Sequence, residues 1–307
     1  MKKLSIVIPV YYNQDSLLLL FKTIQEIEIK LLENKVQIEL IFVDDGSGDD
    51  SLKRLLEIKK LQPSVRIIKH SRNFGSIHAI KTGLSYVNGD CFIILAADLQ
   101  DPPELIVEMV EHWQEGSKYV VCTRLKRKDP FMTRVFAKIY YLLLISLVVP
   151  DYPVGGFDLA LMDKIILPYI LKSSKNINIS LFVFSLGFKP FIIPYQRGER
   201  IHGKSRWTFK KKINYFIDSL LGFSIVPIRL ISILGICISL LSFLYGFIVI
   251  LQALVGGIAV HGFSALASLI SFLLGLVIIM LGIIGEYLWR VFDEVNGRPE
   301  AVVEEVY

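Results

Sequence analysis

CFIILAADLQDPPE, residues 91–104, is the stretch of sequence that decides the fold. Its first five residues are apolar, and the group 98–101 then places two acids and an amide within four positions. An apolar run of this length is typical of a buried strand, and the two prolines that follow end the strand and begin a helix at Glu104. The stretch therefore predicts a buried strand whose carboxyl end carries polar side chains.

Similar apolar runs recur through the first 125 residues. Most are rich in β-branched residues, and each except the last is followed by an amphipathic stretch that closes with Gly, Asn or Pro. This alternation predicts an α/β fold with a mainly parallel sheet and helices on both faces. The runs are LSIVIPV (4–10), IELIFVDD (38–45), VRIIKH (65–70), CFIILAAD (91–98) and YVVCT (119–123).

Polar residues follow four of these runs, at 11–13, 44–49, 70–73 and 98–101. Ligands of such sheets bind beyond the carboxyl ends of the strands, so these residues should converge on one rim. Helix capping is the alternative, because Asp, Asn and Ser also cap helices. Capping alone would explain Asp49 and Asn73, whereas the consecutive acids Asp44 and Asp45 fit either interpretation.

Two apolar segments predict membrane spans near the C-terminus. The chain of 307 residues is 53% hydrophobic with a mean hydropathy of +0.52, and residues 230–285 contain no Asp, Glu, Lys or Arg. The segment 230–254 lies within that window, and the segment 264–288 overlaps the end of the window. Each segment exceeds the roughly 20 residues that cross a ~30 Å hydrocarbon core. A buried helical hairpin is the alternative, but the remaining chain is too small to cover it.

Basic residues predict the orientation of the spans. Lys and Arg are concentrated between 197 and 229, and the loop 255–263 has none. We therefore expect a multi-pass protein of the inner (plasma) membrane with its large N-terminal domain and both termini in the cytoplasm. The net charge of +5, concentrated beside the membrane, favours anionic headgroups or a phosphate substrate over nucleic acid.

Two amphipathic segments, 124–150 and 207–227, couple Lys and Arg to aromatic and aliphatic residues. Their charge content is too high for spans, and the pattern is typical of interfacial helices. A core helix packed on the sheet is the alternative for the first segment. The three cysteines lack metal-type spacing and are odd in number, so we expect reduced packing residues.

The residues after the fourth run are suited to a divalent cation. Mg²⁺ and Mn²⁺ take oxygen ligands, and phosphate-handling sites usually supply one or two carboxylates beside the oxygens of the substrate. Asp98 and Gln100 fit that number of ligands. A metal there would neutralise the charge of a departing diphosphate.

Six ordered motifs together resemble family 2 glycosyltransferases with the GT-A fold. The similarity is to the branch that includes dolichol-phosphate mannose synthase and bacterial undecaprenyl-phosphate glucosyltransferase, and it covers nearly the whole chain. The motifs are IVIPVYYN (6–13), VDDGSGDDS (43–51), SRNFGSIHAIKTGL (71–84), GDCFIILAADLQDPPE (89–104), HGKSRW (202–207) and GEYLWRVFDEVNGRPE (285–300).

The resemblance implies four regions along the chain. We expect a catalytic GT-A domain at 1–200, a donor-site loop and interfacial helix at 201–228, two transmembrane helices at 229–289 and a cytoplasmic tail at 290–307.

The resemblance also implies which residues hold the donor. Pro9, Tyr11 and Asp44 would surround the nucleoside base, and Asp45 would lie towards the ribose. Asp98 and Gln100 would bind the Mg²⁺ or Mn²⁺ on the diphosphate. The donor phosphates would be covered by the loop that carries Arg200, Ser205 and Arg206.

On the acceptor side, Arg124 and Arg134 resemble the arginines that receive the lipid phosphate, and a guanidinium fork suits phosphate oxygens. The segment VGGFDLALMDK (154–164) corresponds to one that carries a candidate general base. Asp158 is the first choice and Asp163 the second. A phosphate monoester, whose second pKa is ~6, is already ionised at neutral pH and needs no base to remove a proton. Asp158 would then either orient the acceptor or support the sugar. Helix capping is the structural alternative for Asp158.

One departure weakens the metal motif. Many relatives carry Asp-x-Asp, and here Ala96 stands where the first acid is expected. Metal binding therefore depends on Asp98, with Gln100 or Asp101 assisting.

The resemblance thus implies a metal-dependent, inverting transfer of one sugar from a nucleotide diphosphate to polyprenyl (undecaprenyl) phosphate. UDP is the preferred nucleotide, as in a UDP-sugar such as UDP-glucose. A processive polysaccharide synthase is the enzymatic alternative, but its Gln-x-x-Arg-Trp signature is absent because Gly203 precedes Lys-Ser-Arg-Trp. A non-catalytic membrane scaffold is the other alternative, and Ala96 favours it. The sugar, the final glycan and self-association as a homo-oligomer stay open.

Overall fold

The computed structural model describes residues 1–124, 156–196, 222–254 and 263–307, together with 142, 144–146, 149, 152, 153 and 219. Both predicted interfacial segments therefore lie largely outside the described residues. The same holds for four predicted site residues, namely Arg134, Arg200, Ser205 and Arg206.

The chain forms two compact units. The first contains Met1–Leu220 together with Pro299–Tyr307, and the second contains Leu221–Arg298. The last nine residues, which lie within the predicted cytoplasmic tail at 290–307, therefore belong to the first unit.

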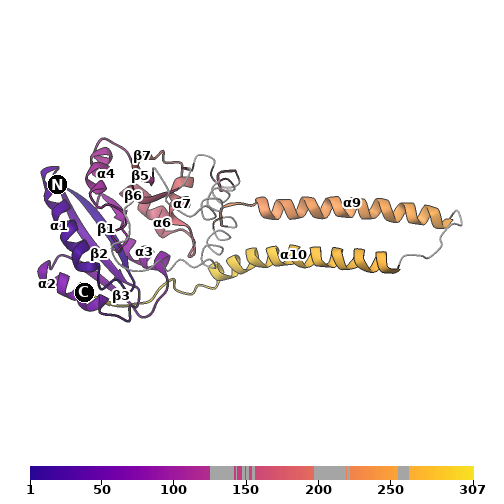
Figure 1. Ribbon diagram of the computed structural model, residues 1–307, viewed down its shortest axis with the longest axis horizontal. Coiled ribbons are helices and arrows are strands. Elements are labelled where there is room, and N and C mark those ends of the chain that lie inside the picture. The colour runs from indigo at the N-terminus through magenta and orange to yellow at the C-terminus, as the bar shows by residue number, and fades with distance from the viewer. Residues whose placement is uncertain are drawn as a thin grey trace. The chain divides into compact units, whose positions relative to one another are not determined.

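A mostly parallel sheet forms the centre of the first unit (Figure 1). Within the described residues its order is β7-β5-β6-β4-β1-β2-β3-β8, in which β6 and β8 run against their neighbours. The strands are β1 (Lys2–Val10), β2 (Val36–Asp44), β3 (Arg66–His70), β4 (Cys91–Ile94), β5 (Tyr119–Arg124), β6 (Phe157–Asp163), β7 (Phe191–Tyr195) and β8 (Val303–Val306).

The predicted α/β class and its five strands are confirmed, and β6, β7 and β8 were not predicted. One boundary differs in a way that matters for the site. β4 ends at Ile94 rather than Asp98, so the acidic group lies in a loop beyond the strand.

Helices cover both faces of the sheet, which explains why its central strands are apolar throughout. On one face Ile24 of α1 and Met109 of α4 join Ile6 and Phe42 in a buried core. On the other face α3 packs closely, because a side chain at Gly83 would clash with Val7. The helices are α1 (Leu17–Glu33), α2 (Ser51–Leu61), α3 (Ser76–Leu84), α4 (Leu105–Gln114), α6 (Leu167–Leu171) and α7 (Ile179–Ser185), with a short 3₁₀ turn η1 (Lys164–Ile166).

Cys91 and Cys122 are buried in this core, as we predicted for packing residues, whereas Cys237 is exposed on a helix of the second unit. Burial raises the pKa of the Cys122 thiol to about 12, which keeps it protonated and unreactive at neutral pH.

The C-terminal strand β8 closes one edge of the sheet. It pairs antiparallel with β3, where Ile68 is opposite Val306. Just before β8, Glu300 accepts a hydrogen bond of 2.7 Å from Nζ of Lys81, whose side chain is only 5% exposed. The same ammonium donates to the carbonyl oxygens of Ser173 and Ser174. The tail therefore joins the sheet edge and α3 to the segment before α7.

We expect Glu300→Gln to lower the free energy of unfolding of the first unit by about 2 kcal/mol, because a buried ammonium would lose its charged partner. Glu304→Gln is the matched control, since Glu304 pairs at 2.9 Å with Lys69 on the exposed side of the same tail. That change should cost less than about 0.5 kcal/mol. Denaturant unfolding of the purified protein measures both, and equal losses would contradict the prediction.

The second unit contains α9 (Val226–Leu254) and α10 (Phe263–Val295). Each contains a segment long and apolar enough to cross a membrane, Ile228–Tyr245 and Phe272–Val295, and neither segment is buried within the protein. Inside this unit Tyr287 donates a hydrogen bond of 2.9 Å to the carbonyl oxygen of Ser224. α10 continues beyond the boundary at 289 that the sequence predicted.

Candidate active site

The loops after β2 and β3 lie against each other at the predicted rim. Asp45 joins them, because its carboxylate accepts hydrogen bonds from the backbone N–H groups of Phe74 at 2.8 Å and Gly75 at 2.9 Å. Nδ1 of the buried His70 lies 2.9 Å from the same carboxylate. Gly46, with φ of 68°, permits this approach, since a Cβ there would lie 2.5 Å from the backbone of Arg72. In this structure Asp45 anchors a loop, and its assignment to the ribose stays a prediction.

Pro9, Tyr11 and Asp44 come together where β1 and β2 end. Pro9 is opposite Val43 in the sheet, and the next residue along β1 is opposite Asp44. Tyr11 is 36% exposed and makes an edge-to-face contact with Tyr12. Asp44 is buried, and one of its carboxylate oxygens accepts a hydrogen bond of 3.2 Å from the backbone N–H of Ser47. The structure thus groups the three residues that we predicted beside the base.

We expect Asp44→Asn to raise Tm at pH 7. Burial raises the pKa of Asp44, although hydrogen bonds from Ser47 oppose the shift, so ionising this carboxyl destabilises the fold. A raised folded-state pKa means that the cost is fully present above that pKa and disappears as the pH falls below the unfolded value, about 4. The gain in Tm should therefore shrink on acidification, and a gain that grew would contradict the prediction.

The loop after β4 carries the candidate metal ligands in a strained conformation. Leu99 has a φ of +56°, a left-handed conformation that non-glycine residues rarely adopt and that is concentrated at functional sites. The resulting turn lets the backbone N–H of Gln100 donate to the Asp98 carboxylate at 3.3 Å. Upstream, the hydroxyl of Ser16 donates to the carbonyl oxygen of Ala97 at 2.6 Å, which fixes the start of the loop to the residue that precedes α1.

The donor set of this loop fits a hard cation whose coordination shell is completed by substrate. Asp98 and Gln100 supply one carboxylate and one amide, and Ala96 adds nothing at its exposed position. Among the described residues, no group of three or more His, Cys, Asp or Glu side chains could hold a metal ion. Phosphate oxygens would have to complete the coordination, as they usually do for Mg²⁺.

A second cluster lies beside this loop and contains Arg124 at the end of β5 and Asp158 in β6. The guanidinium donates from Nε and Nη2 to both oxygens of the Asp158 carboxylate, and the two side chains are 20% and 21% exposed. Burial disfavours the charged form of Arg124, but Asp158 outweighs that effect, so the pKa of Arg124 is raised. The pair is a fixed, ionised fork of the kind that orients phosphate or sugar groups.

Tyr195 at the end of β7 completes this cluster. Its buried hydroxyl lies 3.0 Å from Oδ2 of Asp158 and 2.8 Å from Oδ1 of Asp101, which is itself buried. Burial and the two carboxylates raise the pKa of Tyr195, so the hydroxyl keeps its proton. Sequence reasoning missed Tyr195, because the short segment FIIPY was not recognised as a strand.

The structure separates the two candidate bases. Asp163 lies at the far end of β6, where it accepts hydrogen bonds from the indole of Trp113 at 2.8 Å and the backbone N–H of Ile165 at 3.1 Å. Burial raises the pKa of Asp163, but these hydrogen bonds and Lys118 outweigh it and lower the pKa. Asp163 therefore caps η1, whereas Asp158 lies within strand β6.

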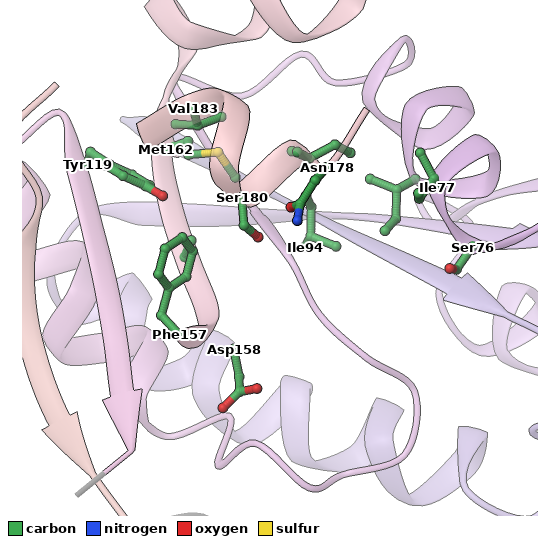
Figure 2. Close-up of a pocket in the computed structure, with 13 residues that line it drawn as sticks. Ser76, Ile77, Ile94, Tyr119, Phe157, Asp158, Met162, Asn178, Ser180 and Val183 are labelled. Carbon is green, nitrogen blue, oxygen red and sulfur yellow. The ribbon is translucent and has the colours of Figure 1, made fainter. Parts of the chain in front are cut away.

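A pocket of about 250 Å³ borders Asp158 (Figure 2). It lies against strands β4, β5 and β6 and is bounded by α3 and by α7 with its preceding Asn178. Its walls are mostly apolar, and Tyr119 presents a buried hydroxyl that has no hydrogen-bond partner in the described structure. The lining residues include Ile77, Ile80, Ile94, Phe157, Ile179 and Val183.

A comparison with protein families identifies the family to which the chain belongs. The model for glycosyl transferase family 2 matches residues 5–169, which include the rim, the loop after β4 and Asp158. The chain belongs to this family. The predicted resemblance, the GT-A fold and the assignment as a glycosyltransferase enzyme are thereby confirmed.

Relatives of this glycosyltransferase match it over almost its whole length. An uncharacterised glycosyltransferase of Bacillus subtilis strain 168, YkcC, is 37% identical over 305 residues, which is 99% of this chain and 94% of that protein. The bactoprenol glucosyl transferase of Shigella phage SfII is 31% identical over 305 residues, covering 98% of this chain and 97% of the relative.

Among solved structures, the mannosyltransferase PcManGT from Pyrobaculum calidifontis, in complex with GDP-Man and Mn²⁺, superposes with a TM-score of 0.51. It is 14% identical and covers 72% of this chain and 63% of its own. At 14% identity this match supports only the assignment of the fold.

Proposed function

We propose that this glycosyltransferase transfers a single sugar, with inversion, from a nucleotide diphosphate to a polyprenyl phosphate at the cytoplasmic face of a membrane. The proposed donor is a UDP-sugar such as UDP-glucose. One observation carries the proposal: the fixed Arg124–Asp158 fork lies beside the loop that holds Asp98 and Gln100. Arg124 would therefore offer a phosphate-binding group beside a candidate diphosphate site.

The relatives support the lipid acceptor. One of them is named a bactoprenol glucosyl transferase and matches 98% of this chain, a share that takes in the apolar helices. The two exposed apolar segments support a membrane location, and we propose that both cross the bilayer. Spans of this kind would keep the active site within reach of a lipid phosphate.

On the donor side, Pro9, Tyr11 and Asp44 would receive the nucleoside base between the ends of β1 and β2. Asp98 and Gln100 would hold Mg²⁺ or Mn²⁺, which when bound would neutralise charge on the departing diphosphate. Asp45 would support this site by accepting hydrogen bonds that fix the loop after β3.

On the acceptor side, Asp158 is better suited to orientation than to proton removal. An arginine in bidentate contact favours the ionised carboxylate and occupies both of its oxygens. The acceptor phosphate is a dianion near neutral pH and needs no base. Asp158 would therefore hold Arg124 in place, and the remaining N–H groups of the guanidinium would donate hydrogen bonds to phosphate oxygens.

The direct test incubates the purified protein with undecaprenyl phosphate, Mg²⁺ or Mn²⁺ and a panel of UDP-sugars and GDP-sugars, then identifies the lipid products by mass. A lipid phosphate that carries one added sugar is the expected product. A ladder of longer products would indicate a processive synthase instead. No product with any donor would overturn the proposed function.

A further inference from the structure

The hydroxyl of Tyr195 connects two parts of the site that come from different strands. Asp101 is the residue after Gln100 in the loop beyond β4, and Asp158 lies in β6. Tyr195 reaches both, at 2.8 Å and 3.0 Å, from the end of β7. A continuous series of contacts therefore runs from the candidate metal loop through Tyr195 to Asp158 and Arg124.

Burial makes this arrangement effective. Tyr195 is 5% exposed and Asp101 is 6% exposed, so water competes little for either group. A hydrogen bond to a carboxylate in such surroundings is stronger than one in solvent. A phenol is also stiff, because its ring packs in the core and only the O–H rotates.

We propose that Tyr195 is a positioning residue that fixes the Asp158–Arg124 fork relative to the loop carrying Asp98 and Gln100. This inference rests on the proposed function, in which the loop holds the donor and the fork holds the acceptor. Transfer requires the acceptor oxygen and the sugar carbon to approach in line, and small misplacements reduce rate steeply. Tyr195 touches neither substrate in this role and acts through the two aspartates.

The chain supplies a matched control for removing this hydroxyl. Tyr119 is also a buried tyrosine in the same sheet, on the neighbouring strand β5, and its hydroxyl lacks a hydrogen-bond partner in the described structure. Tyr195→Phe and Tyr119→Phe therefore delete the same atom from similar surroundings. Only the first deletion breaks contacts within the candidate site.

Kinetics test the catalytic consequence. We expect Tyr195→Phe to lower kcat about tenfold relative to the wild-type protein, with little change in KM for the nucleotide sugar. In the Asp158→Asn background, Tyr195→Phe should add less than about twofold, because the two residues act as one unit. A wild-type kcat in Tyr195→Phe, or full additivity with Asp158→Asn, would overturn the proposal.

Amide hydrogen exchange tests the physical connection without any substrate. We expect faster exchange of residues 96–101 in Tyr195→Phe than in Tyr119→Phe, because the loop would lose its link to β7. Unchanged exchange would show that Tyr195 holds nothing in place and would overturn the inference. A failed transfer assay with wild-type protein would instead overturn the proposed function, so the two failures are distinguishable.

Discussion

Asp98→Asn should lower kcat about 1,000-fold, which is the largest effect expected from a single substitution in this chain. Asp98 is the one carboxylate that the candidate metal loop offers beside Gln100, since Asp101 is engaged with Tyr195. An amide keeps the shape and can still accept the hydrogen bond from the backbone N–H of Gln100. The loss should therefore come from charge rather than from misfolding, and unchanged Tm would verify this.

Two companion variants sharpen that result. Glu115→Gln removes a carboxylate of an exposed pair with His112 and should leave kcat unchanged. Ala96→Asp adds an acid at an exposed position of the loop and should lower the Mn²⁺ concentration for half-maximal activity about tenfold. If Asp98→Asn kept wild-type activity at saturating Mn²⁺, the assignment of this loop to the metal would be wrong.

Arg124→Lys should lower kcat/KM for polyprenyl phosphate about 100-fold while it leaves KM for the nucleotide sugar nearly unchanged. Lysine keeps the positive charge but cannot reproduce the two parallel hydrogen bonds that the guanidinium makes with Asp158. The ammonium would be a point charge that fixes neither the carboxylate nor a phosphate in one orientation.

The matched control is Arg54→Lys, because Arg54 forms an exposed pair with Glu57 at 2.8 Å on α2. That change should alter neither kinetic constant, since exposed pairs contribute little. Initial rates at varied acceptor concentration measure both variants. An equal effect on donor and acceptor would contradict the assignment of Arg124 to the acceptor side.

The strands that could be predicted from sequence are those that carry their own signal. β1 and β2 are apolar runs buried on both faces, and pairing to parallel neighbours requires such runs. β8 reads VEEV and is exposed along its length, so nothing in its composition marks a strand. It is a strand because the backbone groups of β3 at the sheet edge pair with it.

Some features of the candidate site could likewise be predicted from the sequence, and others could not. Position near the end of a strand was enough to predict the rim: Asp44 ends β2 and Asp98 lies in the loop after β4, at the same edge of the sheet. It could not show that Asp45 points inward, because that depends on N–H groups contributed by the loop at 71–75. Nor could it pair Arg124 with Asp158, which are distant in sequence and meet only because β5 and β6 are adjacent.

The pairing of β8 with β3 also constrains the order in which the molecule is completed. The last nine residues belong to the first unit although Leu221–Arg298 precede them in the chain. A polypeptide that leaves a domain, enters a bilayer and returns to the same domain must return to the side it left, so the proposed crossings must be even in number. During synthesis from the N-terminus, the open edge of β3 cannot be closed until both apolar helices have left the ribosome. Completion of the catalytic sheet therefore follows synthesis of the two apolar helices, so a chain truncated before its last strand would expose an unpaired edge.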